Sequence, residues 1–141
     1  MAIWKFIESF QRGLKRRASA GPEVARDQPI MSDMFIRVAS RGTPFNTVID
    51  VGAAVGGWSA TFAEAIPGKT HLLIEANSTH EPALSACCQV RQNWEYVLKA
   101  CGREPGRVFF DGSDPFGGVA SDVATATAKQ SVEVTSIDHE I

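Results

Sequence analysis

The chain has 141 residues, of which 44% are hydrophobic and 21% are charged, and its formal net charge is −2. This length predicts a single domain, and the composition excludes an intrinsically disordered chain. The 14 basic and 16 acidic residues are unevenly distributed. Residues 1–20 hold five of the basic and one of the acidic residues, which leaves 9 basic and 15 acidic residues for the remainder. An acidic main body excludes broad nucleic-acid binding by that part of the chain.

The N-terminal sequence, the lack of a long apolar segment and the cysteines indicate a cytoplasmic protein. No apolar run of roughly 7–15 residues follows the N-terminal charges, so no signal peptide is predicted. No stretch of about 20 apolar residues is present to span a bilayer. Cys87, Cys88 and Cys101 lack the spacing of a metal site, and we expect buried, reduced thiols and no bound metal.

Residues 1–45 are predicted to form N-terminal helices and a linker. An apolar stripe in residues 1–18 predicts an amphipathic helix that packs on the domain or makes weak peripheral contact with a membrane. Its members are Ile3, Ile7, Phe10 and Leu14. Residues 19–29 are rich in Gly, Pro and small side chains and are typical of a linker. A second helix is predicted over residues 30–41, with inward-facing Met31, Met34, Phe35 and Val38.

From residue 46 the pattern alternates between strands and helices. The segments "TVIDV", "THLLIEA" and "EYVLKAC" (95–101) are apolar runs typical of buried parallel strands. Helices are predicted between them over "GWSATFAEAI" and from the capping box "STHE" (78–81) to about Arg91. A short strand "RVFF" and a last strand "SVEVTSI" flank a Gly-rich segment. This order predicts an α/β fold whose first β-α-β-α-β half is Rossmann-like, with a short hairpin after it.

The loop "DVGAAVGGWS" (50–59) fits three ligand-binding patterns. A P-loop would need a lysine where Trp58 stands, to contact the phosphates. A dinucleotide fingerprint would place Ala54 at its second glycine and would bring pyrophosphate close to Asp50. An S-adenosylmethionine (SAM) loop uses Asp50, Gly52 and Gly56, and the cationic groups of SAM suit an acidic residue. Electrostatics therefore favour SAM, with an NAD-binding Rossmann protein as an alternative.

The order of these motifs resembles the FkbM family of SAM-dependent methyltransferases. The resemblance covers residues 46–141, through "TVIDVGAAVGGWSATFAEAIP", "LLIEANSTHEPAL", "VLKACGREPGRVFF" and "SVEVTSID". It implies a class I methyltransferase sheet in which residues 46–141 form a SAM-binding half domain. The family continues after this point with a K-x-D-x-x-G strand, which is not found here, so we expect a chain that lacks the substrate-facing half.

The resemblance also implies a set of cofactor-binding residues. Those carried over from the family motifs, with their immediate neighbours, are Asp50, Gly52, Ala53, Gly56, Glu75, Ala76, Cys101 and Gly102. Glu75 at the end of the second strand would bind the ribose hydroxyls, because a carboxylate suits a vicinal diol. Ala100, Cys101 and Gly102 would lie beside the adenine.

The implied activity is O-methylation of a sugar or another small-metabolite hydroxyl, with a small-molecule or glycan acceptor. No side chain is predicted as the catalytic base. His71, His80 and His139 are interpreted as solvated polar residues. The alternative function is a SAM-binding protein without turnover.

Overall fold

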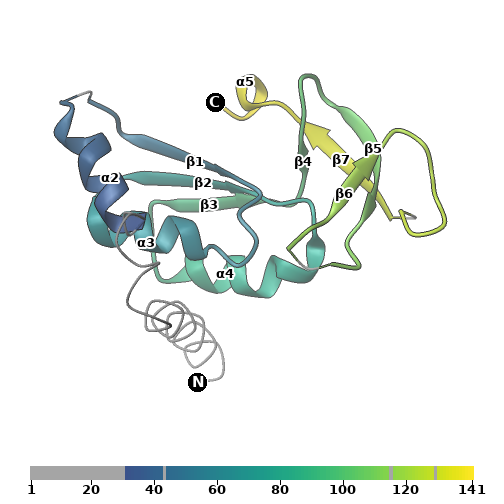
Figure 1. Ribbon diagram of the computed structural model, residues 1–141, viewed down its shortest axis with the longest axis horizontal. Helices are drawn as coiled ribbons and strands as arrows, with labels where there is room; N and C mark the ends of the chain where they lie inside the picture. The colour runs from purple at the N-terminus through teal and green to yellow at the C-terminus, as the bar shows by residue number, and fades with distance from the viewer. Residues whose placement is uncertain (1–30, 43, 115, 129) are drawn as a thin grey trace, which may run out of the picture.

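The structure, a computed structural model, describes residues 31–42, 44–114, 116–128 and 130–141. The predicted helix over residues 1–18 and the linker after it lie outside these residues. Figure 1 shows two sheets joined where β3 ends. In chain order the elements are α2 (Met31–Ser40), β1 (Thr47–Val51), α3 (Gly57–Ala65), β2 (Thr70–Ile74), η1 (Ser78–His80), α4 (Glu81–Gln89), β3 (Trp94–Val97), β4 (Ala100–Cys101), β5 (Gly106–Asp111), β6 (Val119–Ser121), β7 (Gln130–Thr135) and α5 (Ile137–Glu140).

The first sheet is parallel, with the strand order β1-β2-β3. This is the order of the first half of a doubly wound sheet. Figure 1 shows α3 and α4 along the same side of the sheet. The structure therefore confirms the predicted α/β fold and agrees with a Rossmann-like class I methyltransferase sheet over this part of the chain.

Alternate residues of these strands form the core, because successive side chains of a strand point to opposite faces. Leu73 of β2 is fully buried and packs with Leu84 and Cys87 of α4 and with Trp94 of β3. A second cluster packs Val48 of β1 against Phe35 of α2 and Phe62 of α3. Together the two clusters hold α3 and α4 against the sheet.

The second helix forms as predicted, but three of its four predicted inward residues face solvent. Phe35 is buried and packs against Trp58 and Phe62 of α3, and its ring centroid lies 4.9 Å from the centroid of each of these rings. Met31, Met34 and Val38 are 39%, 52% and 52% exposed. The prediction was wrong for these residues because α2 meets α3 through a narrow aromatic contact that the Phe35 ring fills.

The predicted third strand divides into two. Trp94–Val97 stays in the first sheet, whereas Ala100 and Cys101 pair in parallel with Val134 and Thr135 of β7. The second sheet has the order β4-β7-β5-β6, and β5 runs antiparallel to both of its neighbours. In the part of the chain that the structure describes, no helix is long and apolar enough to cross a membrane.

Candidate ligand-binding site

A cavity of about 230 Å³ opens where the carboxyl ends of β1 and β2 meet the second sheet. In open α/β sheets, ligands bind outside the carboxyl ends of the strands. The lining comes from four segments of the chain: Val51, Gly52 and Ala54; Ile74, Glu75, Ala76 and Asn77; Lys99, Ala100 and Cys101; and Phe110, Phe116 and Gly118. The cavity is smaller than the roughly 300–1,000 Å³ that encloses a drug-sized ligand, so these residues would surround only part of one.

The loop after β1 wraps over the end of β2. The amides of Gly52 and Ala53 both donate to the carbonyl of Ile74, over 2.9 and 3.1 Å. Gly52 and Gly56 have φ of 77° and 75°, which only glycine adopts without strain. A Cβ at Gly56 would also lie 3.3 Å from Cys87 Sγ. The glycines that matched the SAM motif thus shape the backbone here, and Gly52 is the one that lines the cavity.

Glu75 holds this loop in place from the end of β2. Its Oε2 accepts a hydrogen bond from the Ala54 amide, and its Oε1 accepts one from the Asn77 amide, both over 2.7 Å. Ala54 has a φ of 48°, an unfavourable value for a residue with a Cβ. The carboxylate lines the cavity and has about four acceptor sites in all, so two remain for a ligand.

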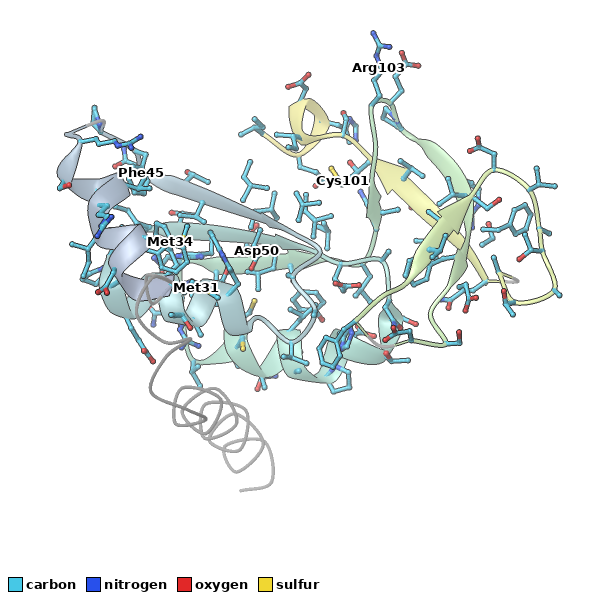
Figure 2. The ribbon with its side chains drawn as sticks, viewed as in Figure 1. Met31, Met34, Phe45, Asp50, Cys101 and Arg103 are labelled. Atoms are coloured by element: carbon cyan, nitrogen blue, oxygen red, sulfur yellow. The ribbon has the colours of Figure 1, made fainter. Side chains whose placement is uncertain are left out.

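Asp50 lies under the loop and not among the cavity-lining residues. Figure 2 shows it within the three-stranded sheet. Its Oδ2 accepts a hydrogen bond from Ser59 Oγ over 2.7 Å, and the Ser59 amide also donates to it. Burial raises the pKa of Asp50, and the hydrogen bonds from Ser59 oppose that shift. The acid predicted to lie at the methionine end of SAM is therefore bound to Ser59 in the first turn of α3.

The remaining predicted residues divide between the cavity and its support. Ala76 and Cys101 line the cavity, whereas Ala53 is buried in the core of the first sheet. Gly102 is outside the lining: its amide donates to the Thr135 carbonyl, and a Cβ there would lie 2.7 Å from Val134 Cγ1. Of the eight predicted residues, Gly52, Glu75, Ala76 and Cys101 meet at the cavity.

Asn77 is a cavity residue that sequence reasoning missed. Its Oδ1 accepts from the Thr79 amide and hydroxyl, over 3.1 and 2.7 Å. The predicted capping box was therefore wrong, because Asn77 caps the η1 turn in place of Ser78. An Asn before a turn is itself a common cap, which is the signal that would have located it.

Lys99 lines the cavity, and its ammonium group forms ion pairs with Glu140 and Glu133. Its Nζ lies 2.9 Å from Glu140 Oε1 and 3.7 Å from Glu133 Oε1. Thr135 Oγ1 donates to the same oxygen of Glu140 over 2.6 Å. The hydrogen bond to Glu140 raises the pKa of Lys99, so this lysine keeps its proton at neutral pH.

Two of the three histidines are not solvated as predicted. His71 is fully buried, with its ring stacked on Trp94 at 4.3 Å, and His80 is 6% exposed. His71 pairs in register with Trp94 across β2 and β3, and that pairing puts it on the face that α3 and α4 cover. His139 on α5 is exposed, as predicted. Within residues 31–141 as far as they are described, no group of three His, Cys, Asp or Glu side chains is placed to hold a metal ion.

Comparison with known proteins gives little beyond this geometry. No model of a protein family matches the chain, and no curated protein matches it. Among solved structures, the chain resembles a proposed caffeoyl-CoA O-methyltransferase from Staphylococcus aureus, with a TM-score of 0.44 and 16% sequence identity. The match covers 64% of this chain and 42% of that chain. At this TM-score the likeness carries no argument about function, and the FkbM resemblance stays a prediction.

Proposed function

We propose that this chain binds SAM in the cavity beside Glu75, as part of an FkbM-type methyltransferase that acts on a hydroxyl of a sugar or another small metabolite. The observation that carries the proposal is the position of Glu75. Its carboxylate is fixed at the end of β2 by two amides and lines the cavity with acceptor capacity to spare. A carboxylate at this place in a Rossmann-like sheet suits the two hydroxyls of a ribose.

Asp50 supports SAM over a dinucleotide. A dinucleotide places its pyrophosphate at the N-terminus of the first helix of the fold, where free amides receive it. Here the Asp50 carboxyl group already accepts the hydrogen bonds of Ser59 in the first turn of α3. An ionised Asp50 about 4 Å from a phosphate would cost roughly 4 kcal/mol at an effective dielectric of 20. SAM carries no phosphate and avoids this repulsion.

Calorimetric titration with S-adenosylhomocysteine (SAH) tests the proposal. We expect the Glu75→Gln variant to bind SAH about 1.5–3 kcal/mol more weakly, the range for a hydrogen bond to a charged group. Glu64→Gln, which removes an exposed carboxylate from α3, is the matched control and should bind normally. NADH binding more tightly than SAH to the unmodified chain would overturn the choice of ligand.

A second ligand separates ribose recognition from the support that Glu75 gives the loop. Glu75→Gln also disturbs the hydrogen bond to Ala54 or to Asn77, so reduced affinity alone does not identify the ribose as the partner. An SAH analogue without the 2′ and 3′ hydroxyls should bind the unmodified chain weakly. The Glu75→Gln variant should then bind SAH and the analogue with similar affinity, since the interaction is already lost. An undiminished preference for SAH in the variant would contradict the ribose assignment.

A SAM-binding protein without turnover is a second candidate, and the cavity itself favours it. SAM supplies an activated methyl group, and the hydroxyl acceptor must lose a proton to a base as the methyl is transferred. In the described lining, Lys99 holds its proton through Glu140, and the free acceptor positions of Glu75 are the ones assigned to the ribose hydroxyls. Release of SAH from SAM in the presence of a panel of sugars would support the enzyme. SAM binding without release of SAH would support the second candidate.

A further inference from the structure

One side of α2 carries an apolar stripe, formed by Met31, Met34 and Val38. These residues are three and four positions apart, so their side chains follow one another along the helix. All three are exposed among the described residues. The stripe adjoins Phe35, whose buried ring packs on the ring of Trp58 in α3, and Trp58 is itself exposed. A contiguous apolar surface of this kind marks an interaction site.

Residues 1–18 of the same chain carry a stripe that matches the one on α2. In this segment Ile7, Phe10 and Leu14 are also three and four positions apart. Each stripe therefore covers seven residue steps, which is about 10.5 Å of helix. This heptad spacing is the one that lets two helices pack side by side.

The connection between the two stripes is long enough for an antiparallel arrangement. Sixteen residues separate Leu14 from Met31, and an extended chain advances about 3.3 Å per residue. The connection can therefore reach either end of α2, whose ten residues are about 15 Å long. A flexible tether holds the segment at a local concentration on the order of millimolar. This proximity favours residues 1–18 over a second copy of the chain.

The charges of the two segments favour the antiparallel direction. When the stripes are aligned antiparallel, Glu8 lies level with Arg37 along the helix axes. In the same register Arg12 lies level with Asp33, so both pairs bring opposite charges together. A parallel alignment of the stripes brings neither acidic residue level with a basic one. Opposite charges across a pair of helices set its orientation.

We infer that the apolar stripe of α2 is the docking surface for residues 1–18 of the same chain, which pack on it as an antiparallel helix. This arrangement places Leu14 beside Met31 and Ile7 beside Val38, and it removes both stripes from water. No residue of α2 is among those that line the cavity, so the inference does not depend on the proposed ligand.

Thermal melting of full-chain variants with unchanged net charge tests the docking surface. Val38→Gln and Ile7→Gln should each lower the melting temperature by about 2–5 °C, because each removes part of an apolar contact. The double variant should lose no more than either single variant, since both changes break the same contact. Ile36→Gln is the matched control and should leave the melting temperature unchanged. Ile36 is 53% exposed against 52% for Val38, but it lies on the opposite side of α2.

A cross-link then locates the contact. The full chain with Ile7→Cys and Val38→Cys should form an intramolecular disulfide under mild oxidation, identified by mass spectrometry of its peptides. The chain with Ile7→Cys and Ile36→Cys should not form one. An unchanged melting temperature for Val38→Gln, or an equal loss for Ile36→Gln, would overturn the inference. So would equal bonding at positions 36 and 38, or no bonding at position 38. A disulfide between two chains would assign the stripe to a second copy and would also overturn it.

Discussion

Asp50 and Ser59 form a buried hydrogen-bonded pair, in which the hydroxyl of Ser59 donates to Asp50 Oδ2 over 2.7 Å. Ser59 is fully buried, and Asp50 is 8% exposed. The pair joins the end of β1 to the first turn of α3 and so anchors both sides of the intervening loop. A negative charge near a helix N-terminus is favourable, and a buried carboxylate needs such partners.

Ser59→Ala should lower the free energy of unfolding by about 1–3 kcal/mol, because it removes a hydrogen-bond donor from a buried carboxylate. Burial already raises the pKa of Asp50, and loss of the donor should raise it further. A raised carboxyl pKa means that ionisation opposes folding, so the loss should be larger at pH 7 than at pH 4. Urea denaturation at both pH values measures it, with the exposed Ser40→Ala as control. An equal loss at the two pH values would contradict the role of Asp50.

His71 should make the fold sensitive to acid. Burial, together with the charge of Arg91, lowers the pKa of His71 to about 4. Neither of its ring nitrogens has a hydrogen-bond partner among the described residues. Because the folded pKa lies below the unfolded value, stability should fall as the pH drops from about 6.5 to 4, by about 3 kcal/mol in total.

His71→Phe should remove this part of the pH dependence and raise stability at pH 7, since a ring of similar size replaces an unsatisfied polar one. Urea midpoints measured from pH 7 to pH 4 give the comparison. His139→Gln changes an exposed histidine and should leave the profile unaltered. A His71→Phe profile parallel to that of the unmodified chain would show that another group causes the acid sensitivity.

Gly56→Ala should destabilise the chain more than Gly68→Ala. Both residues have positive φ, 75° and 79°, so both substitutions introduce backbone strain of about 1–2 kcal/mol. Only at Gly56 would the new methyl group also meet Cys87 and Leu73, at 3.3 and 3.4 Å. Thermal melting of the two variants compares them. Equal losses would mean that the contact with α4 does not matter.

Residues 1–18 should bring weak, salt-sensitive attachment to anionic vesicles if their apolar stripe faces a membrane. Each basic residue near an anionic surface adds about 1 kcal/mol, and Lys15, Arg16 and Arg17 are adjacent. Vesicle sedimentation of the full chain and of residues 21–141 tests this prediction. Equal recovery of both in the supernatant would favour packing of the segment on the domain.

The order of strands and helices in the first sheet was predictable from the sequence, because it depends on short-range patterns. The strand Thr47–Val51 is rich in β-branched residues, and glycines such as Gly52 and Gly56 mark tight turns. The position of Glu75 at a strand end followed from the same patterns. Residues at the carboxyl ends of adjacent parallel strands meet at one edge of a sheet, so Glu75 could be assigned to a site.

Contacts between distant segments decided the rest. The break after Val97 depends on the pairing of Ala100 with Val134, and no local pattern specifies that partner. Phe110 reaches the cavity only because β5 packs in the second sheet, and His71 is buried only because its register sets it beside Trp94. The periodicity of a segment determines which of its faces is apolar. Which surface covers that face, and which side chains share a cavity, depends on packing between segments far apart in the chain.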